Sequence, residues 1–136
     1  MARKPKALVL DSWAVLAFLQ AEAAGQKVAD LVGDALEQSV PLLMSVINAG
    51  EVWYIFAREI SEAEAEKAIE SLRHLGIEFV DVDWELARQA AAYKSNRKMS
   101  YADCFAAALS KMRKADLITG DSEFRQVESE VQIHWL

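Results

Sequence analysis

Cysteine and histidine are scarce in this chain of 136 residues. It has one cysteine, Cys104, and two histidines, His74 and His134. A lone cysteine cannot form a disulfide within the chain, and so few nitrogen and sulfur ligands almost exclude a Cys/His zinc site. Any metal ion that the protein binds must therefore be held by oxygen ligands.

Long apolar runs are also missing. Hydrophobic residues make up 53% of the chain, yet no segment approaches the roughly 20 consecutive apolar residues that a membrane-spanning helix needs. The basic residues 3–6 are not followed by the apolar region and small-residue cleavage site of a signal peptide. We therefore expect a cytoplasmic protein that does not contact a membrane.

Segments rich in proline or glycine are absent, since the chain has only 2 prolines and 5 glycines. We find no internal repeat, no low-complexity segment and no linker. A chain of this length can bury a substantial core without disulfides. The expectation is one domain that spans residues 1–136.

The chain has no excess of positive charge. It carries 15 Lys and Arg against 21 Asp and Glu, a formal net charge of −6. This balance argues against a protein that binds nucleic acid through net electrostatic attraction. The argument weakens if several of the acids bind metal, because divalent cations reverse the local field.

Short apolar segments alternate with longer amphipathic ones along the whole sequence. The apolar segments predict buried strands at residues 7–10, 42–46, 77–82, 117–119 and 131–135. Helical spacing and capping patterns predict helices at residues 13–20, 26–38, 47–58, 61–75, 84–95 and 100–111, with a short helix after residue 121. This alternation predicts an α/β fold, a three-layer α/β/α sandwich around a mostly parallel five-stranded sheet.

Two acids follow predicted strands. Asp11 comes directly after the first strand, and Asp121 follows the fourth strand after one glycine. The carboxyl ends of parallel strands lie at one edge of the sheet, where α/β proteins bind their ligands. A helix cap or a turn would also explain each aspartate.

Two further acids stand in predicted helices. Glu51 interrupts an apolar helix pattern, and an acid in that position is seldom buried unless it is paired or bound to metal. The alternative is an ion pair with Arg58, or a helix that packs less deeply. Asp103 occupies the third position of a capping box that begins at Ser100, a role that needs no catalysis.

If these four acids converge, their like charges raise one another's pKa and disfavour the site. A divalent cation would relieve the repulsion. Ligation by oxygen alone suits Mg²⁺ or Mn²⁺, which also bind phosphate oxygens. Such an ion can orient and help deprotonate a water molecule, so the expected reaction is phosphodiester hydrolysis.

Four short motifs carry a family resemblance. They are LDS at residues 10–12, SVINAGE at 45–51, SYADCFAAA at 100–108 and LITGDSEF at 117–124. In their order and spacing the chain resembles the PIN-domain ribonucleases of the VapC toxin type, over essentially its full length.

The resemblance implies roles for particular residues. Asp11, Glu51, Asp103 and Asp121 fall on the acidic catalytic positions that hold Mg²⁺ or Mn²⁺. Ser12 and Thr119 fall where the family often has a hydroxyl that supports the acids, and Glu123 would be a further acid near the rim. Family membership would also imply an RNA substrate, a homodimer, and a small antitoxin partner whose tail covers the active site.

Three other functions are compatible with acids after buried strands. A catalytically silent PIN-like binding or scaffold module would use the same acids as helix caps. A Mg²⁺-binding receiver-type signalling domain would have adjacent acids after its first strand, whereas Leu10 precedes a single Asp11 here. A haloacid-dehalogenase-like phosphatase would need a second Asp where this chain has Trp13.

Overall fold

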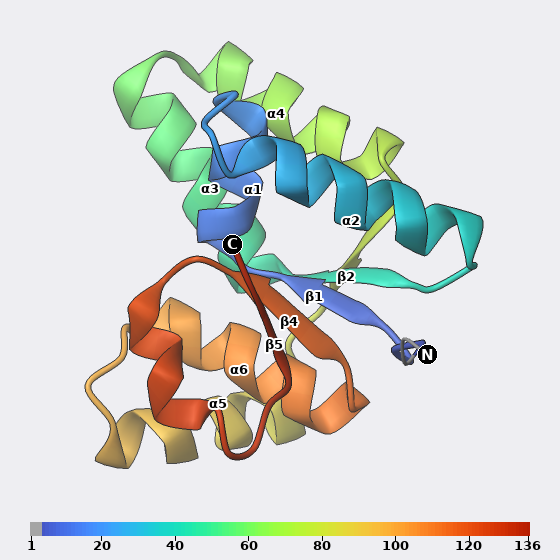
Figure 1. The fold of residues 1–136 in the computed structure, drawn as a ribbon. Helices are drawn as coiled ribbons and strands as arrows, with labels where there is room; N and C mark the ends of the chain where they lie inside the picture. Colours follow the sequence, from blue (N-terminus) through green and yellow to red (C-terminus); the bar gives the residue numbers. More distant parts are fainter. Residues whose placement is uncertain (1–3) are drawn as a thin grey trace.

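The computed structural model describes residues 4–136, and residues 1–3 lie outside the description. A five-stranded sheet runs through the middle of the molecule in the order β3-β2-β1-β4-β5 (Figure 1). Its strands are β1 (Leu8–Leu10), β2 (Leu42–Ser45), β3 (Ile77–Val80), β4 (Asp116–Thr119) and β5 (Ile133–Trp135). Every neighbouring pair is parallel.

Helices cover both faces of this sheet. Four helices lie above it in Figure 1: α1 (Ser12–Leu19), α2 (Gly25–Glu37), α3 (Val46–Glu59) and α4 (Glu62–His74). Two lie below it: α5 (Trp84–Asn96) and α6 (Tyr101–Arg113). A short 3₁₀ helix, η1 (Ser122–Val127), joins β4 to β5. The three-layer α/β/α sandwich expected from the sequence is confirmed.

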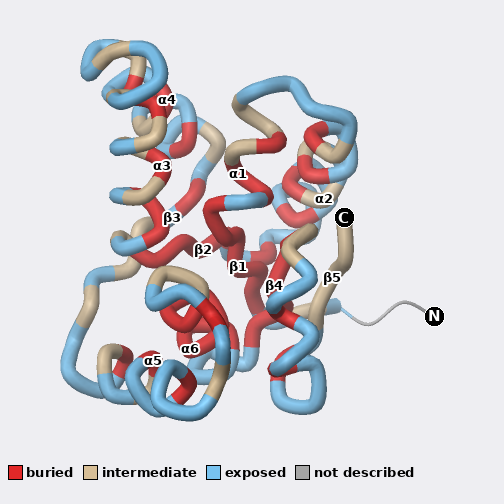
Figure 2. Tube along the Cα trace, turned by 90° about the vertical axis from the view of Figure 1, so that its left-hand side faces the viewer, coloured by how far each residue is buried: buried red, intermediate tan, exposed pale blue. Residues whose placement is uncertain are grey.

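The strands are apolar on both faces because each face meets a helical layer. In β1, Leu8 and Leu10 belong to the core beneath α1–α4, whereas Val9 belongs to the core shared with α5 and α6. Figure 2 shows the buried residues concentrated in the central strands and on the inner sides of the helices. A sheet buried on both faces explains why its strands read as continuous apolar segments.

The junction between α1 and α2 differs slightly from the prediction. Helix α2 begins at Gly25, one residue before the predicted helix of residues 26–38. A Cβ atom on Gly25 would lie 2.5 Å from the carbonyl oxygen of Ala17. The two helices therefore approach more closely here than any other residue would allow.

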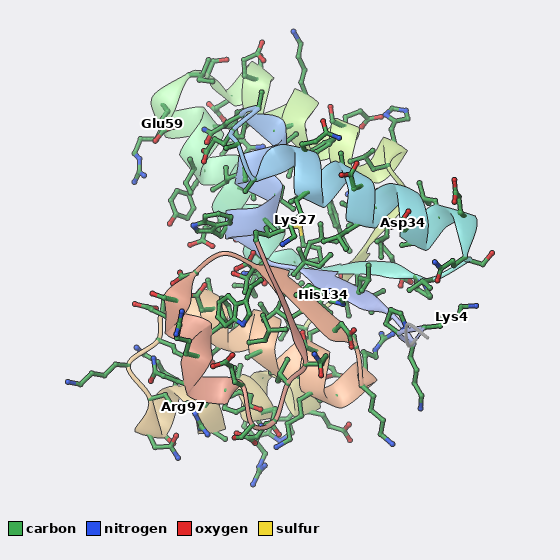
Figure 3. The ribbon with its side chains drawn as sticks, in the orientation of Figure 1. Lys4, Lys27, Asp34, Glu59, Arg97 and His134 are labelled. Atoms are coloured by element: carbon green, nitrogen blue, oxygen red, sulfur yellow. The ribbon has the colours of Figure 1, made fainter. Side chains whose placement is uncertain are left out.

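The structure also shortens two predicted strands by two residues each. β3 ends at Val80 rather than at residue 82, because the chain turns toward Asp83, whose side chain accepts a hydrogen bond from the Leu86 amide at 2.9 Å. β5 begins at Ile133. Lys27 of α2 holds this last strand by donating a hydrogen bond to the Trp135 carbonyl at 2.7 Å (Figure 3).

The strand order bears on the receiver-type alternative. Receiver domains have the order 2-1-3-4-5, in which the first strand does not lie at the centre of the sheet. Here β1 is the central strand, between β2 and β4. This finding excludes the receiver fold. Among residues 4–136, no helix combines the length and the apolar character needed to cross a membrane.

Candidate metal centre

Asp11 begins the site at the carboxyl end of β1. Its Oδ1 atom accepts a hydrogen bond from the Ala14 amide at 2.8 Å and so caps α1. Its Oδ2 atom accepts a hydrogen bond from the hydroxyl of Thr119, the last residue of β4. The side chain is almost fully buried. Asp11 therefore serves as a helix cap and also joins two neighbouring strand ends.

Asp121 follows the neighbouring strand. The Thr119 hydroxyl accepts a hydrogen bond from the Asp121 amide at 3.0 Å. The Asp121 Oδ1 atom in turn accepts a hydrogen bond from the Glu123 amide at 2.9 Å and caps η1. These bonds fix the short turn that brings both acids to the sheet edge.

The other two acids come from helices whose first turns are capped by serine. Ser100 caps α6 by accepting a hydrogen bond from the Asp103 amide at 3.1 Å, as the capping pattern predicts. Ser45 caps α3 by accepting a hydrogen bond from the Ile47 amide at 3.1 Å, and Glu51 lies in the next turn. Both helix starts are thereby held beside the strand ends.

Three carboxylates meet at this edge. One carboxylate oxygen each from Asp103, Asp121 and Glu123 lies within 4.8 Å of the other two. They open onto a hollow of about 340 Å³. The lining residues of this hollow, which we call the acidic hollow, are Ser12, Trp13, Leu16, Glu51, Ile55, Ser100, Asp103, Asp121 and Glu123.

The remaining expected residues lie around this cluster. Ser12 and Glu51 line the acidic hollow, although Glu51 is not part of the close group of three. Asp11 is buried near the group, close enough for the charges of Asp103 and Asp121 to raise its pKa. The ion pair of Glu51 with Arg58, which was the alternative, does not form between these described residues; the Arg58 guanidinium lies 5.4 Å from the centre of the Tyr54 ring.

The electrostatics of the site are unusual for aspartate. Burial raises the pKa of Asp11 from 3.8 to about 7, against the lowering effect of its hydrogen bonds from Thr119 and Ala14. Burial also raises the pKa of Asp103 to about 7, with a further rise from Asp121 and a lowering effect of the hydrogen bond with Ser100. Without a cation, these carboxyls would be partly protonated at neutral pH.

These residues fit a hard divalent cation. The donors are all carboxylate oxygens, which Mg²⁺ and Mn²⁺ prefer. A cation would also favour the ionised form of the two acids whose pKa lies near 7, and would reduce the repulsion among them. The chemistry of the donor set therefore supports the metal site that the sequence indicates.

Comparison with known proteins identifies the family of the chain. A model of the PIN-domain family matches residues 8–130. The chain belongs to the PIN-domain family. A search of curated proteins finds no match.

The fold of this PIN domain is shared by several solved structures of toxin–antitoxin proteins. VapBC2 from Rickettsia felis, bound to a promoter DNA fragment, has a TM-score of 0.74 at 13% identity and covers 95% of this chain and 98% of its own. VapC20 from Mycobacterium tuberculosis, a toxin that cleaves the sarcin-ricin loop, has a TM-score of 0.66 at 19% identity, with 89% and 95% covered. VapBC-1 from nontypeable Haemophilus influenzae has a TM-score of 0.72 at 16% identity, with 94% and 96% covered. At such identities the likeness establishes the fold.

Two features of the PIN-domain site were not found from the sequence. A Cβ atom on Gly120 would lie 2.3 Å from the ring of Trp13, so this glycine lets the indole pack against the turn before Asp121. The only signal for it is a glycine between Thr119 and Asp121. The Gln126 side chain accepts a hydrogen bond from the Lys98 amide at 3.1 Å and donates to the Glu123 carbonyl at 3.2 Å. It ties η1 to the segment before α6, and an exposed glutamine gives no sequence signal for such a contact.

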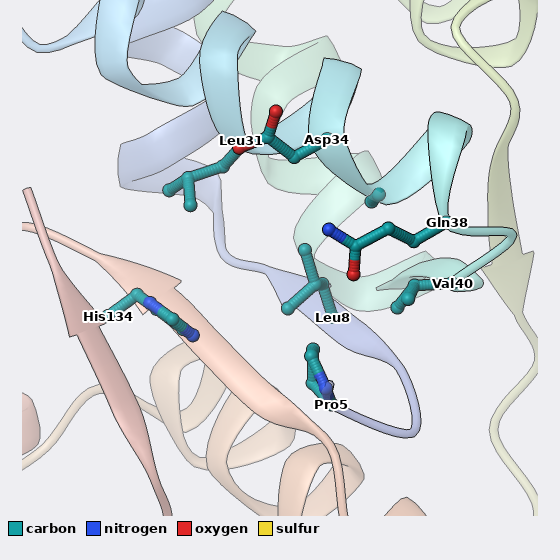
Figure 4. Close-up of a pocket in the computed structure, with 8 residues that line it drawn as sticks. Pro5, Leu8, Leu31, Asp34, Gln38, Val40 and His134 are labelled. Atoms are coloured by element: carbon teal, nitrogen blue, oxygen red, sulfur yellow. The ribbon is translucent and has the colours of Figure 1, made fainter. Parts of the chain in front are cut away.

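A second hollow, of about 220 Å³, lies between α2 and the amino ends of the strands (Figure 4). Leu31 of α2 and Gln38, which directly follows α2, face Leu8 and His134 of the sheet across it. His134 pairs with Asp116, with 2.9 Å between its Nε2 and the carboxylate. This hollow lies at the opposite ends of the strands from the acidic hollow, and its described lining residues include no group of converging acids.

Proposed function

We propose that this PIN domain is a Mg²⁺- or Mn²⁺-dependent endoribonuclease that hydrolyses RNA phosphodiester bonds. The observation that carries the proposal is the convergence of Asp103, Asp121 and Glu123 within 4.8 Å of one another, beside the buried Asp11, at the carboxyl edge of a parallel sheet. Repulsion among so many acids is a cost to folding that a structural role alone does not require.

The residues take separate roles in this proposal. Asp11, Glu51, Asp103 and Asp121 would hold the cation, and Glu123, whose carboxylate lies within 4.8 Å of those of Asp103 and Asp121, would be a further acid beside it. A bound divalent cation would neutralise these charges, contact phosphate oxygens and lower the pKa of the attacking water. It would also compensate for the net charge of −6, which otherwise repels RNA.

The chain's own groups would orient the reaction. The Thr119 hydroxyl holds the Asp11 carboxylate at the strand ends through its hydrogen bond to Oδ2. Glu123 lines the exposed edge of the acidic hollow, where its carboxylate lies within 4.8 Å of those of Asp103 and Asp121. Trp13 is 37% exposed and lines the hollow, so its indole could stack on a nucleobase.

We further propose that the protein is the toxin of a toxin–antitoxin pair and acts as a homodimer in the cytoplasm, where RNA is available. The support is the shared fold with VapBC complexes from several bacteria. The partner would be a small antitoxin protein whose tail covers the acidic hollow. Residues 1–136 would form one PIN-like domain.

A cleavage assay tests the nuclease proposal. Purified protein should cut single-stranded RNA with Mg²⁺ or Mn²⁺ and stop when a chelator is added. Asp103→Asn and Asp121→Asn should each lower the rate by about 10²–10³-fold, as expected for loss of an electrostatic contact in an active site. The matched control is Asp34→Asn, which removes an exposed carboxylate on α2. Cleavage that survives in both site variants would contradict the proposal.

A catalytically silent binding or scaffold module is the second candidate. It is favoured by the capping bonds that Asp11 and Asp121 both make, since these account for two of the acids without catalysis. Calorimetric titration with Mn²⁺ separates the two functions. Binding that is lost in Asp121→Asn supports the nuclease, whereas no binding at millimolar Mn²⁺ supports the scaffold.

A further inference from the structure

Asn48 is a fully buried amide in the first turn of α3. Its Nδ2 atom donates a hydrogen bond to the Ala102 carbonyl oxygen at 3.1 Å and a longer one to the Ser12 hydroxyl at 3.4 Å. The Ser12 hydroxyl donates in return to the backbone carbonyl oxygen of Asn48 at 3.2 Å. One side chain thus connects the first turns of three helices.

The position of this amide relative to the acids is specific. Ser12 directly follows Asp11 in the chain, and Ala102 directly precedes Asp103. Asn48 itself precedes Glu51 by three residues, which places the two on the same side of α3. The amide therefore contacts or adjoins the segments that carry three of the four expected metal ligands.

The other end of the amide has no partner. Among the described residues, Asn48 Oδ1 is the buried side-chain oxygen or nitrogen atom that has no hydrogen-bond partner. Rotating the amide by half a turn would not help, because Oδ1 would then face the Ala102 carbonyl oxygen. A buried polar atom without a partner costs free energy, so the fold tolerates this amide for a reason other than stability.

We propose that Asn48 is a positioning residue, which holds the starts of α1 and α6 at a fixed distance from Glu51 and so sets the spacing of the metal-binding carboxylates. This inference rests on the proposed function. Residues outside the coordination sphere commonly orient ligands in this way, and their loss lowers metal affinity by about 10–100-fold. The fourth acid, Asp121, is held separately by the Thr119 hydroxyl.

The inference predicts a specific effect on metal binding. Asn48→Leu keeps the number and branching of the side-chain heavy atoms and removes the donor that binds the Ala102 carbonyl. The folded variant should bind Mn²⁺ about 10–100-fold more weakly than the unchanged protein, measured by calorimetry at pH 8, where Asp11 and Asp103 are ionised. Asn48→Ala, which removes the same donor and adds no bulk, should show the same loss.

Ser110→Ala is the matched control. Ser110 is also fully buried, but its hydroxyl donates only to the Ala106 carbonyl oxygen within α6, at 2.9 Å. Its substitution removes a buried hydrogen bond about two helical turns beyond Asp103 and outside the lining of the acidic hollow, so it should lower the melting temperature and leave Mn²⁺ affinity unchanged. In RNA cleavage at saturating Mn²⁺, the Asn48 variants should lower kcat with little change in KM, because Asn48 does not line the acidic hollow.

The outcomes separate this inference from the proposed function. If the unchanged protein does not bind Mn²⁺, the proposed function is overturned and this inference with it. If the unchanged protein binds Mn²⁺ and both Asn48 variants bind it equally well, the nuclease proposal stands and the positioning role is overturned. Equal losses of affinity in Ser110→Ala and the Asn48 variants would also overturn it, because the effect would then follow from stability alone.

Discussion

The hydroxyl of Thr119 donates a hydrogen bond to Oδ2 of Asp11, across the carboxyl ends of the neighbouring strands β1 and β4. The hydroxyl oxygen of Thr119 also accepts a hydrogen bond from the Asp121 amide at 3.0 Å. Thr119 is fully buried. One hydroxyl therefore fixes two acids that lie 110 positions apart in the chain, numbered 11 and 121.

Thr119→Val removes this hydroxyl and keeps the shape of the side chain. The Asp11 carboxylate and the Asp121 amide would each lose a partner, so we expect a loss of about 1–3 kcal/mol in the free energy of unfolding. Mn²⁺ affinity should fall by about tenfold or more. Urea denaturation and calorimetry measure the two effects. Thr119→Ser, which keeps the hydroxyl, should retain most of the affinity; a valine variant that binds Mn²⁺ normally would contradict this role.

The raised pKa of Asp11 makes the stability of the metal-free protein depend on pH. Its carboxyl takes up a proton at about pH 7 in the folded protein, but only near 3.8 in the unfolded chain. Between these values the folded state binds more protons, so its stability falls as the pH rises from about 4 to about 7. We expect the free energy of unfolding without metal to be lower at pH 8 than at pH 4.5, by on the order of 2 kcal/mol.

Chemical denaturation in the presence of a chelator measures this dependence. Asp11→Asn should reduce the slope, because the amide does not titrate. The same substitution at Asp34, an exposed acid of α2, should leave the slope as it is. A stability that rises between pH 4.5 and pH 8 in the unchanged protein would contradict the assignment.

The affinity for metal should rise with pH, whereas the stability of the metal-free protein should fall. A cation binds the ionised carboxylates, so it must displace the protons held by Asp11 and Asp103, whose pKa values lie near 7. The apparent Mn²⁺ affinity should therefore rise from pH 5.5 to pH 7.5 and level off above pH 8. Calorimetry in buffers of different ionisation enthalpy would measure the protons released. An affinity that does not change over this range would show that neither carboxyl takes part.

Gly120→Ala tests the wall of the acidic hollow. The added Cβ atom would meet the Trp13 ring at 2.3 Å, so the indole must move. We expect a loss of about 1–3 kcal/mol in stability and a weaker affinity for Mn²⁺. The matched control is Gly33→Ala in α2, where a Cβ atom meets nothing within 4 Å. That change should raise stability by about 0.5–1 kcal/mol, because alanine is the better helix former.

The layers of the fold could be predicted because each strand is a short apolar segment between helical patterns. Residues 7–10 and 42–46 predicted β1 and β2 to within one residue at each end. The order of the strands could not be predicted, because it depends on pairings between distant segments. Local patterns also gave no sign of the close approach of Gly25 to Ala17, which sets where α2 begins.

The location of the acids followed from a general rule. Asp11 and Asp121 come after parallel strands, whose carboxyl ends share one edge of the sheet, so both acids could be assigned to that edge. Which of the carboxylates lie closest together could not be predicted from this rule. Glu123 was expected only at the rim, yet it lies in the close group of three, whereas Glu51 lies outside it. That difference depends on how the turn after β4 is held by Thr119, a tertiary contact with no local pattern.

The most direct test of the account is a crystal structure of the protein soaked in Mn²⁺, with anomalous diffraction recorded at the manganese absorption edge. The account predicts an anomalous peak in the acidic hollow within coordination distance of carboxylates of Asp103 and Asp121, and no such peak in Asp121→Asn crystals treated in the same way. A hollow without manganese at saturating concentration, or a peak bound only at other acids of the surface, would contradict it.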